Sequence, residues 1–374
     1  MYWAGSDGSM VTKTSMADVA RAAGVSKSTV SRALAGDSRV KEATRLRIEQ
    51  AAQELGYIPN RIARALARGR TEMIAVVTPT PPRSFSDPFY LEFLGGLGDR
   101  VMEAGYSLVI TSPGAGGSPA SSLAELAAGR VVDGAVLTEV QVDDPRLALL
   151  RQAPLPFVVL GTPEDASGGV VPGVWFVDGD NEGGARQVVE HLLSLGHRRI
   201  ACITGPLHLV SARRRLAGYL QALQAAGVAS SPEWVVEGDF TREGGLRAGQ
   251  HLLQARLLDL REPGSLTAIF ASNDLMAIGV LEALRGAGLR VPEDVSVAGF
   301  DGIYLADLLE PSLTTGAQPI RALGRIVAEL LLDRLGAAGG DGAAVPEQGG
   351  AVGRRVVVPV QLRVKGSTGP PRGR

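Results

Sequence analysis

A thirteen-residue stretch near the start of the chain, GVSKSTVSRALAG (24–36), combines small hydroxyl side chains with one lysine and one arginine. Ser26 is placed to cap a helix, because its hydroxyl can accept a hydrogen bond from an amide two or three residues later. Lys27, Ser28 and Arg32 then face outward and are candidates for contacts with base edges, since arginine is the usual bidentate partner of guanine. Small hydroxyls also let a helix approach phosphates closely and donate to them. The stretch therefore has the chemistry of a helix that reads DNA.

The neighbouring residues supply the helices that would position this stretch. A first helix presents one apolar face made of Val19, Ala20 and Ala23. Gly24 can adopt the positive φ that ends it, and Val30 and Leu34 turn inward on the second helix. A third helix from Lys41 to Leu55 would bury Ile48, Ala52 and Leu55. Two helices joined by a tight glycine-containing turn form a helix-turn-helix, whose second helix enters the major groove. A helical hairpin without a ligand is the plainer alternative.

Charge is divided unevenly along the chain. The 374 residues carry a net charge of −1, yet residues 1–70 hold 12 Lys/Arg against 6 Asp/Glu. A basic head on an acidic body indicates that the head meets a polyanion. The only cysteine, Cys202, excludes an intrachain disulfide and fits a reducing cytoplasm. No signal-peptide pattern occurs, and no stretch approaches the roughly 20 apolar residues that span a bilayer, so we expect neither export nor a membrane partner.

From Met73 onward, short apolar runs alternate with amphipathic helical stretches. The runs predicted as strands are MIAVV (73–77), YSLVI (106–110), GAVL (134–137), PFVVL (156–160), IACIT (200–204), TAIF (267–270), VSVAG (295–299) and RRVVVPVQLRV (354–364). Strands that alternate with helices imply parallel sheets covered on both faces. About 290 residues are too many for one comfortable sheet, so we expect two similar lobes that divide near Pro172.

The N-terminal segment resembles the headpiece of the lactose-repressor (LacI/GalR) family. The matching motifs are Asp18-Val19-Ala20, Ala23-Gly24-Val25-Ser26 and Thr29-Val30-Ser31-Arg32, continued by ELGYIPNRIARALARGRT (54–71). The resemblance implies phosphate contacts from Thr14, Ser26, Thr29, Ser31, Tyr57 and Asn60. In that family the segment after Tyr-x-Pro-Asn is a hinge helix that orders on specific DNA and pushes a leucine into the minor groove. Leu66 occupies the place of that leucine here, next to Ala63 in the same hinge.

The residues of this hinge support that interpretation. Pro59-Asn60 is a good helix start, and the arginines that follow supply phosphate-binding charge. Ile62 and Leu66 form an apolar pair one turn apart, but so short a helix is marginal alone. A leucine wedge that kinks the duplex is a sensible use of such a residue. Packing of Leu66 against a dimer mate is a compatible alternative.

The resemblance covers nearly the whole chain, with signatures such as SDPFYLEFLGGL (86–97), RRRLAGYLQAL (213–223) and PSLTT (311–315). It implies an α/β fold, in which an all-α helix-turn-helix headpiece precedes a two-lobed, periplasmic-binding-protein-like (Rossmann-like) effector domain with three crossovers. The expected order is a lead-in (1–15), the helix-turn-helix domain (16–58), the hinge (59–70), the effector-binding and dimerisation domain (71–364) and a polar tail (365–374). Lobe 1 would take about 71–172 and 318–337, and lobe 2 about 173–317 and 354–364.

Ligands of open α/β sheets lie beyond the carboxyl ends of strands, where several polar residues fall. Arg215 and Asp301 are the strongest candidates for effector contacts, because a buried charge needs a partner that a ligand could supply. Asn273 follows the strand TAIFA, and amide and carboxylate groups suit sugar hydroxyls. The resemblance places Phe89, Tyr90 and Phe240 to stack on a sugar face. The predicted effector is therefore a small sugar or sugar derivative.

Several of these positions have plainer structural alternatives. Phe89 could be a core residue, and we favour Asp274 as the cap of the helix that starts beside it. The helix that begins near Gly183 could be capped by Asp178, Asp180 or Asn181. Two departures from common family patterns, Gly161 and Gly302, stand where acidic residues are frequent. The identity of a specific sugar is therefore not transferred.

Together these features predict a homodimeric, cytoplasmic and nucleoid-associated repressor, released from a pseudo-palindromic operator by its effector, with no cofactor or metal. His191, His197, His208 and His251 show no metal-ligand spacing, and we expect His197 to end a helix favourably. The absence of nucleophile-elbow and phosphate-loop motifs disfavours an enzyme. The alternatives are an activating or co-repressed regulator, a transport-type sugar-binding protein and a sugar-processing enzyme. The basic head and the missing export signal oppose the transport alternative.

Overall fold

The computed structural model describes residues 14–34, 37–57, 70–78, 87–111, 119–129, 131–259, 262, 264–336 and 353–372. The chain divides into two compact units, the first reaching to Glu72 and the second beginning at Met73. The hinge residues Asn60, Ala63 and Leu66 lie outside the described residues. No helix in the described ranges is long and apolar enough to cross a membrane.

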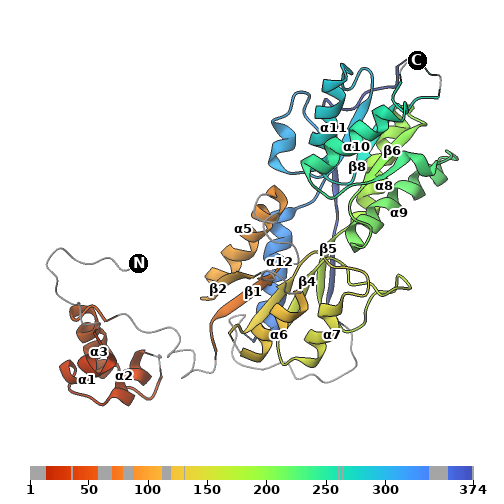
Figure 1. The fold of residues 1–374 in the computed structure, drawn as a ribbon. Helices are drawn as coiled ribbons and strands as arrows, with labels where there is room; N and C mark the ends of the chain where they lie inside the picture. The colour runs from red at the N-terminus through yellow and green to blue at the C-terminus, as the bar shows by residue number, and fades with distance from the viewer. Residues whose placement is uncertain are drawn as a thin grey trace. The chain divides into compact units, whose positions relative to one another are not determined.

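The described part of the first unit contains three helices, α1 (Met16–Ala22), α2 (Lys27–Leu34) and α3 (Glu42–Glu54) (Figure 1). Gly24 has a φ of +63°, so the first helix ends at the predicted glycine turn. The core of this unit centres on Val19, Val30 and Ile48, each 0% exposed. Leu55, expected inside, is 38% exposed because it follows the last helical residue; Ala51 is buried instead.

The second unit holds two six-stranded sheets, one in each lobe (Figure 1). The sheet of lobe 1 has the order β11-β5-β4-β3-β1-β2 and is parallel throughout. Its strands are β1 (Met73–Val77), β2 (Ser107–Thr111), β3 (Gly134–Leu137), β4 (Phe157–Leu160), β5 (Phe176–Gly179) and β11 (Arg355–Val358). Five of these six strands coincide with predicted apolar runs, and β5 is the exception. β5 was not predicted, because it is short and ends in Asp178 and Gly179 rather than in apolar residues.

The sheet of lobe 2 has the order β12-β10-β9-β8-β6-β7, and only β12 runs antiparallel to its neighbour. Its strands are β6 (Ile200–Thr204), β7 (Val235–Glu237), β8 (Ala268–Ala271), β9 (Ser296–Asp301), β10 (Thr314–Ala317) and β12 (Gln361–Arg363). β7 and β10 were not predicted, since neither is a continuous apolar run. The expected α/β class with parallel sheets is confirmed.

The expected lobe boundaries need correction. The division near Pro172 would put β5 into lobe 2, but β5 pairs with β4 and β11 in the sheet of lobe 1. The run 354–364 was likewise assigned whole to lobe 2, yet its first half, β11, belongs to lobe 1 and only β12 belongs to lobe 2. The sequence resembles one strand, whereas Pro359 separates two short ones that pair in different sheets.

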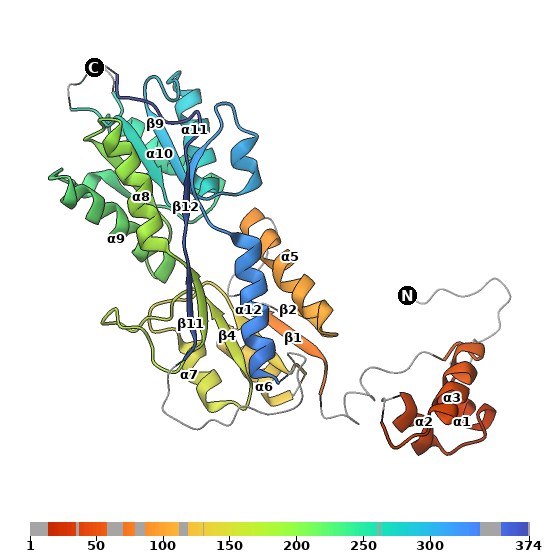
Figure 2. The same ribbon diagram turned by 180° about the vertical axis from the view of Figure 1, so that it is seen from behind.

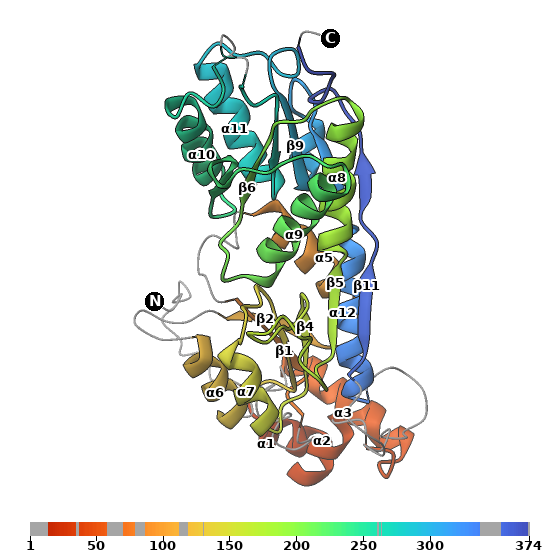
Figure 3. The same ribbon diagram turned by 90° about the vertical axis from the view of Figure 1, so that its right-hand side faces the viewer.

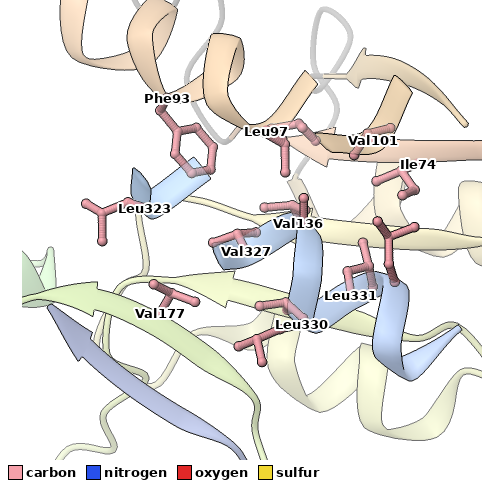
Figure 4. Packing of buried hydrophobic residues seen from close by; sticks show 14 of the residues in the cluster. Ile74, Phe93, Leu97, Val101, Val136, Val177, Leu323, Val327, Leu330 and Leu331 are labelled. Atoms are coloured by element: carbon pink, nitrogen blue, oxygen red, sulfur yellow. The ribbon is translucent and has the colours of Figure 1, made fainter. Parts of the chain in front are cut away.

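Four helices cover the two faces of the first sheet: α5 (Pro88–Glu103), α6 (Pro119–Gly129), α7 (Pro145–Gln152) and α12 (Ile320–Arg334). α5 and α12 lie side by side on one face, opposite α6 and α7 (Figures 1 and 3). Phe93 and Leu97 of α5 meet Leu323 and Val327 of α12 above Val136 of β3, all fully buried (Figure 4). A Cβ at Gly96 would collide with the backbone of α12, so glycine permits this close packing.

The second sheet is also covered on both faces. α8 (Asn181–Ser194) and α9 (Val210–Ala225) pack on one face, and α10 (Arg242–Gln254) and α11 (Asp274–Gly286) on the other (Figure 3). Along β6, Ile200 and Cys202 join the α8–α9 core, whereas Ala201 and Ile203 join the α10–α11 core. A strand buried on both faces reads as a continuous apolar run, which is why β6 was predictable.

Three segments cross between the lobes, as the family resemblance implied. They are the links from β5 to α8, from β10 to α12 and from β11 to β12. Figure 2 shows the last two passing from one lobe to the other, with α12, β11 and β12 drawn in shades of blue. The cleft described below lies where these crossovers run.

Residues 365–372, expected to be a polar tail, are instead packed against lobe 2. Ser367 is fully buried. Its Oγ accepts from Thr314 N at 2.8 Å and donates to Val297 O at 2.6 Å. The segment therefore completes the hydrogen bonding of β9 and β10 beyond the end of β12.

His197 belongs to the same contact region and differs from expectation. It is 1% exposed, and burial lowers the pKa of its imidazole. Its Nε2 donates to Gly369 O at 2.9 Å, and its Nδ1 lies 2.9 Å from Thr267 Oγ1. A neutral, buried imidazole cannot complement a helix dipole, so its role here is to tie the C-terminal segment to lobe 2.

Ser367→Ala should lower the free energy of unfolding by about 1–3 kcal/mol, because it leaves a buried amide and a buried carbonyl without partners. The measurement is urea-induced unfolding of the full chain. The matched control is Ser230→Ala at an exposed serine, expected within about 0.5 kcal/mol of the unmodified protein. Equal stabilities for the two variants would contradict a structural role for the C-terminal segment.

Candidate functional site

The second helix of the first unit presents charge to solvent. Lys27, Ser28 and Arg32 are exposed, whereas Val30 and Ala33 are buried. Within the described part of the chain, neither Lys27 nor Arg32 forms an ion pair. Other arginines of this unit do, in the pairs Arg21–Asp18, Arg39–Asp37 and Arg45–Glu42. The two cations of α2 are therefore available to an anionic partner.

Ser26 joins three hydroxyl groups at the start of α2. Its Oγ accepts from Thr29 N at 3.1 Å, so it caps the helix as predicted. The same Oγ lies 2.8 Å from Ser28 Oγ and 2.8 Å from Thr29 Oγ1. Three hydroxyls supply three protons and their two mutual contacts use two, which leaves one for a phosphate oxygen. Ser28 is thus tied to the cap, a constraint that the sequence did not show.

Two of the residues predicted to contact phosphate also have structural partners. Thr14 Oγ1 donates to Leu55 O at 2.9 Å, which fastens the entry of α1 to the end of α3. Tyr57 packs partly buried against the core of the unit. Ser31 is half-buried on α2. Their contacts with DNA remain predictions.

A cleft of about 820 Å³ lies in the second unit and is lined by both lobes. The structure brings all six residues predicted to contact the effector to this one cleft: Phe89, Tyr90, Arg215, Phe240, Asn273 and Asp301. Carboxyl ends of strands from both sheets face it, including those of β4, β5 and β9. This is where ligands of open α/β sheets bind.

Arg215 of α9 is the central cation of the cleft and is 6% exposed. Its Nε donates to Asn181 Oδ1 at 2.7 Å, its Nη1 donates to Ser272 O, and its Nη2 lies 3.1 Å from Asp301 Oδ1. The guanidinium also lies over the ring of Phe300, 4.1 Å from the centroid. A buried cation is tolerable only when its donors are satisfied, and here each nitrogen has a partner.

Asp301 is held in a conformation that side chains rarely adopt. It ends β9 with a φ of +107° and is 6% exposed. Its Oδ1 accepts from Gln318 Nε2 at 2.9 Å in addition to pairing with Arg215. Burial raises the pKa of Asp301, and Arg215 opposes that shift. Strained backbone at a polar, buried residue is typical of ligand sites.

All three crossovers touch this group of residues. Asn181 directly follows the first crossover, and Gln318 lies in the second. Val360, in the third, is 4% exposed and belongs to the same core as Phe300. The links between the lobes therefore converge on the surroundings of Arg215.

The cap of α11 is Asn273 and not Asp274, and Asn273 also lines the cleft as predicted. Asn273 Oδ1 accepts from Met276 N at 2.9 Å and caps α11, whereas Asp274 was expected to be the cap. Asp274 is fully buried and accepts from Gly302 N at 2.7 Å, among other donors. Burial, with repulsion from Asp301, raises the pKa of Asp274 to about 8. Two adjacent polar residues at a helix start cannot be told apart by type alone.

The aromatic residues line the cleft from both lobes. Phe240, with a φ of +62°, has its ring against the backbone of Gly205, where any Cβ would overlap it. Phe89 and Tyr90 pack edge to face with ring centroids 6.1 Å apart. Phe89 also contacts the core of lobe 1, so its alternative role as a core residue is partly correct.

Several polar residues of the cleft were missed as effector contacts. Asp87, Glu139, Asp178, Asn181 and Gln318 all line it. Glu139, Asp178, Asn181 and Gln318 follow or end a strand or lie at a crossover, so the strand-end rule could have found them, whereas Asp87 is the N-cap of α5. Asp178 and Asn181 were expected only as helix caps. Gly161 also lines the cleft with a φ of +107°, a backbone conformation that favours glycine.

The lobes also meet beside the cleft through backbone groups. Val142 N donates to His208 O and Val210 N donates to Val140 O, both at 3.1 Å. Arg214 of lobe 2 forms an ion pair with Glu164 in the loop that follows β4. Backbone pairing between lobes requires one relative lobe position, so any change of lobe angle must break it.

Comparison with known proteins agrees with this architecture. Residues 15–60 match the model described as bacterial regulatory proteins of the lacI family, and residues 189–368 match a periplasmic binding protein-like domain. The transcriptional regulator CelR of Thermobifida fusca is 41% identical over 322 residues, which are 85% of this chain and 90% of that protein. The repressor CytR of Escherichia coli K12 is 37% identical over 324 residues, which are 87% and 90% of the two chains.

Solved structures extend the comparison to three dimensions. A complex of the regulator CelR with cellobiose matches with a TM-score of 0.69 and 37% identity, covering 95% of this chain and 99% of that one. The Lac repressor dimer bound to operator and the anti-inducer ONPF matches with a TM-score of 0.79 and 30% identity, covering 96% and 100%. With its helix-turn-helix and its two-lobed cleft, the chain belongs to the LacI family of bacterial transcriptional regulators.

Proposed function

We propose that the chain is a ligand-responsive repressor that binds a pseudo-palindromic operator as a homodimer. One observation carries the proposal: a helix with available cations and a polar cleft at the lobe crossovers occur in the same chain. Lys27 and Arg32 have the chemistry for major-groove contacts. The similarity to a Lac repressor dimer bound to its operator supports both operator binding and dimerisation.

The cleft supplies the means of release. A ligand that contacts residues of both lobes stabilises one angle between the lobes. Because the crossovers join the lobes, a change of that angle moves one lobe relative to the other. In a dimer the angle sets the spacing of the two hinges, residues 59–70, on the DNA. Ordering two short helices is worth only a few kcal/mol, so a modest difference in ligand affinity between states can switch DNA binding.

We propose a small carbohydrate as the effector. Phe240 offers a stacking face, and Asp301 and Asn181 offer groups that suit sugar hydroxyls. Related structures with sugars support this class: CelR with cellobiose, and a LacI-family regulator of Enterococcus faecium with ribose. Co-repression or activation by the same ligand remains the alternative sign of response.

We further infer that the cleft binds without catalysing a reaction and uses no cofactor. Its central arginine is fully engaged in the structure, and no group of three potential metal ligands occurs among the described residues. The proposed localisation is the cytoplasm, at the nucleoid, because the proposed target is chromosomal DNA.

The test of the function is a gel-shift titration with the DNA upstream of the chain's own gene, with and without candidate sugars. A specific shift that a sugar reverses supports the repressor. A shift that a sugar strengthens instead supports co-repression. The absence of any specific shift, with and without sugars, would refute the proposal that the chain regulates transcription at this DNA.

Arg32→Ala should relax base preference, with a loss of about 1–3 kcal/mol of discrimination at one position of each half-site. Asn60→Ala should instead weaken binding evenly across sequences, because it removes a phosphate contact. The measurement is operator affinity against a panel of single-base variants. Unchanged discrimination in Arg32→Ala would remove this residue from base readout.

Leu66→Ala should weaken binding to the operator far more than binding to non-specific DNA. A wedge between base steps contributes only where the duplex is kinked, whereas non-specific binding depends on phosphate contacts. Fluorescence anisotropy with operator and with scrambled duplex gives the two affinities. Equal losses on both duplexes would refute the wedge.

Phe240→Ala should weaken sugar binding about fivefold or more while leaving operator affinity without ligand unchanged. An aromatic face on an apolar or CH-rich ligand surface is worth on the order of 1 kcal/mol or more. Calorimetric titration measures the ligand, and Leu220→Ala, at a 40% exposed position of α9 outside the cleft lining, is the control. Retention of full sugar affinity by Phe240→Ala would place the ligand elsewhere.

A further inference from the structure

The lining of the cleft carries more negative than positive side chains. Its arginines are Arg215, Arg242 and Arg247. Its carboxylates are Asp87, Glu139, Asp178, Asp239, Glu243 and Asp301. Among the described residues that line the cleft, carboxylates therefore outnumber arginines by two to one.

Each of these arginines already has a carboxylate partner. Arg215 pairs with Asp301 at 3.1 Å, as described above. Arg247 pairs with Asp239 at 2.7 Å. Arg242 pairs with Glu243 at 3.0 Å and also with Glu282. A phosphate entering the cleft would have to compete with these internal pairs for every guanidinium.

Helix starts at the cleft, which can bind anions, are also occupied. Asp87 caps α5 by accepting from Phe89 N at 2.9 Å. Thr241 and Asn273 cap α10 and α11 in the same way. α9 has no side-chain cap, but its first amide, Val210 N, donates across the cleft edge to Val140 O.

Asp87 lines the cleft at the capped start of α5, together with carboxylates from both lobes. Burial, together with repulsion from Asp301 and Glu139, raises the pKa of Asp87 to about 7. Glu139 is itself held by a hydrogen bond with the side chain of Tyr90. A further negative charge at this point would meet unscreened repulsion from both lobes.

We propose that the cleft admits neutral effectors and rejects anionic ones such as sugar phosphates, and that Asp87 determines this specificity. The proposal rests on the cleft being the effector site. It follows from the pairing of each lining arginine, the occupied helix starts and the place of Asp87 among the carboxylates that line the cleft. Shape and hydroxyl recognition remain tasks of the other lining residues.

The experiment titrates the full chain by calorimetry at pH 8, where Asp87 is mostly ionised, with cellobiose, ribose and glucose, each beside its monophosphate. The expected result is that the neutral sugar that binds does so at least tenfold more tightly than its phosphate. In Asp87→Asn the affinity for that phosphate should rise about tenfold relative to the affinity for the neutral sugar. Asparagine keeps the helix cap, so α5 should remain intact.

The matched control is Asp180→Asn, a capping aspartate of α8 that does not line the cleft. It should leave the ratio of the two affinities unchanged. A gain in phosphate affinity cannot arise from structural damage, because damage to the cleft would weaken the binding of both ligands. Equal binding of sugar and phosphate by the unmodified chain, or an unchanged ratio in Asp87→Asn, overturns the proposal and leaves the effector site standing. If no sugar or phosphate binds, the effector site itself fails, and this inference falls with it.

Discussion

The structure depends on one buried cation, the guanidinium of Arg215. An arginine inside a domain is stable only if acceptors surround it, and here they come from three separate segments of chain, at Asn181, Ser272 and Asp301. Asn181 follows one crossover, and Asp301 is held by Gln318 of another. The ring of Phe300 supports the guanidinium from the core side. Because these partners lie where the lobes are joined, the need to satisfy the charge of Arg215 fixes the geometry of the crossovers between the lobes.

This arrangement explains how a small ligand in the cleft could change the DNA affinity of the helix-turn-helix unit. The cleft takes side chains from both lobes, and the lobes are also paired by backbone hydrogen bonds at Val140 and Val142. Such contacts have few intermediate arrangements, so the domain favours discrete lobe positions. A ligand that prefers one of them shifts the population and therefore the affinity for DNA. Carboxylates that crowd the same cleft, above all Asp87, then decide which ligands can exert that effect.

Much of this could be predicted from the sequence, and the failures have physical causes. Buried parallel strands such as β6 are continuous apolar runs, and the turn at Gly24 is specified by glycine itself. The six predicted cleft residues do share one cleft, since strand ends of a parallel sheet face the same side. β5 and β11 were placed in the wrong lobe because sheet membership depends on long-range pairing. Which of Asn273 and Asp274 caps α11 depends on backbone direction, which residue type does not reveal.

The most direct test of the account is whether effector and operator affect each other equally. Binding free energies are reciprocal, so the factor by which the effector weakens operator binding must equal the factor by which operator weakens effector binding. Calorimetry with the effector sugar, on the free dimer and on the dimer saturated with operator, measures the second factor. A value of about fivefold or more that matches the first factor is the predicted result. The same effector affinity in both states would contradict the link between cleft and DNA.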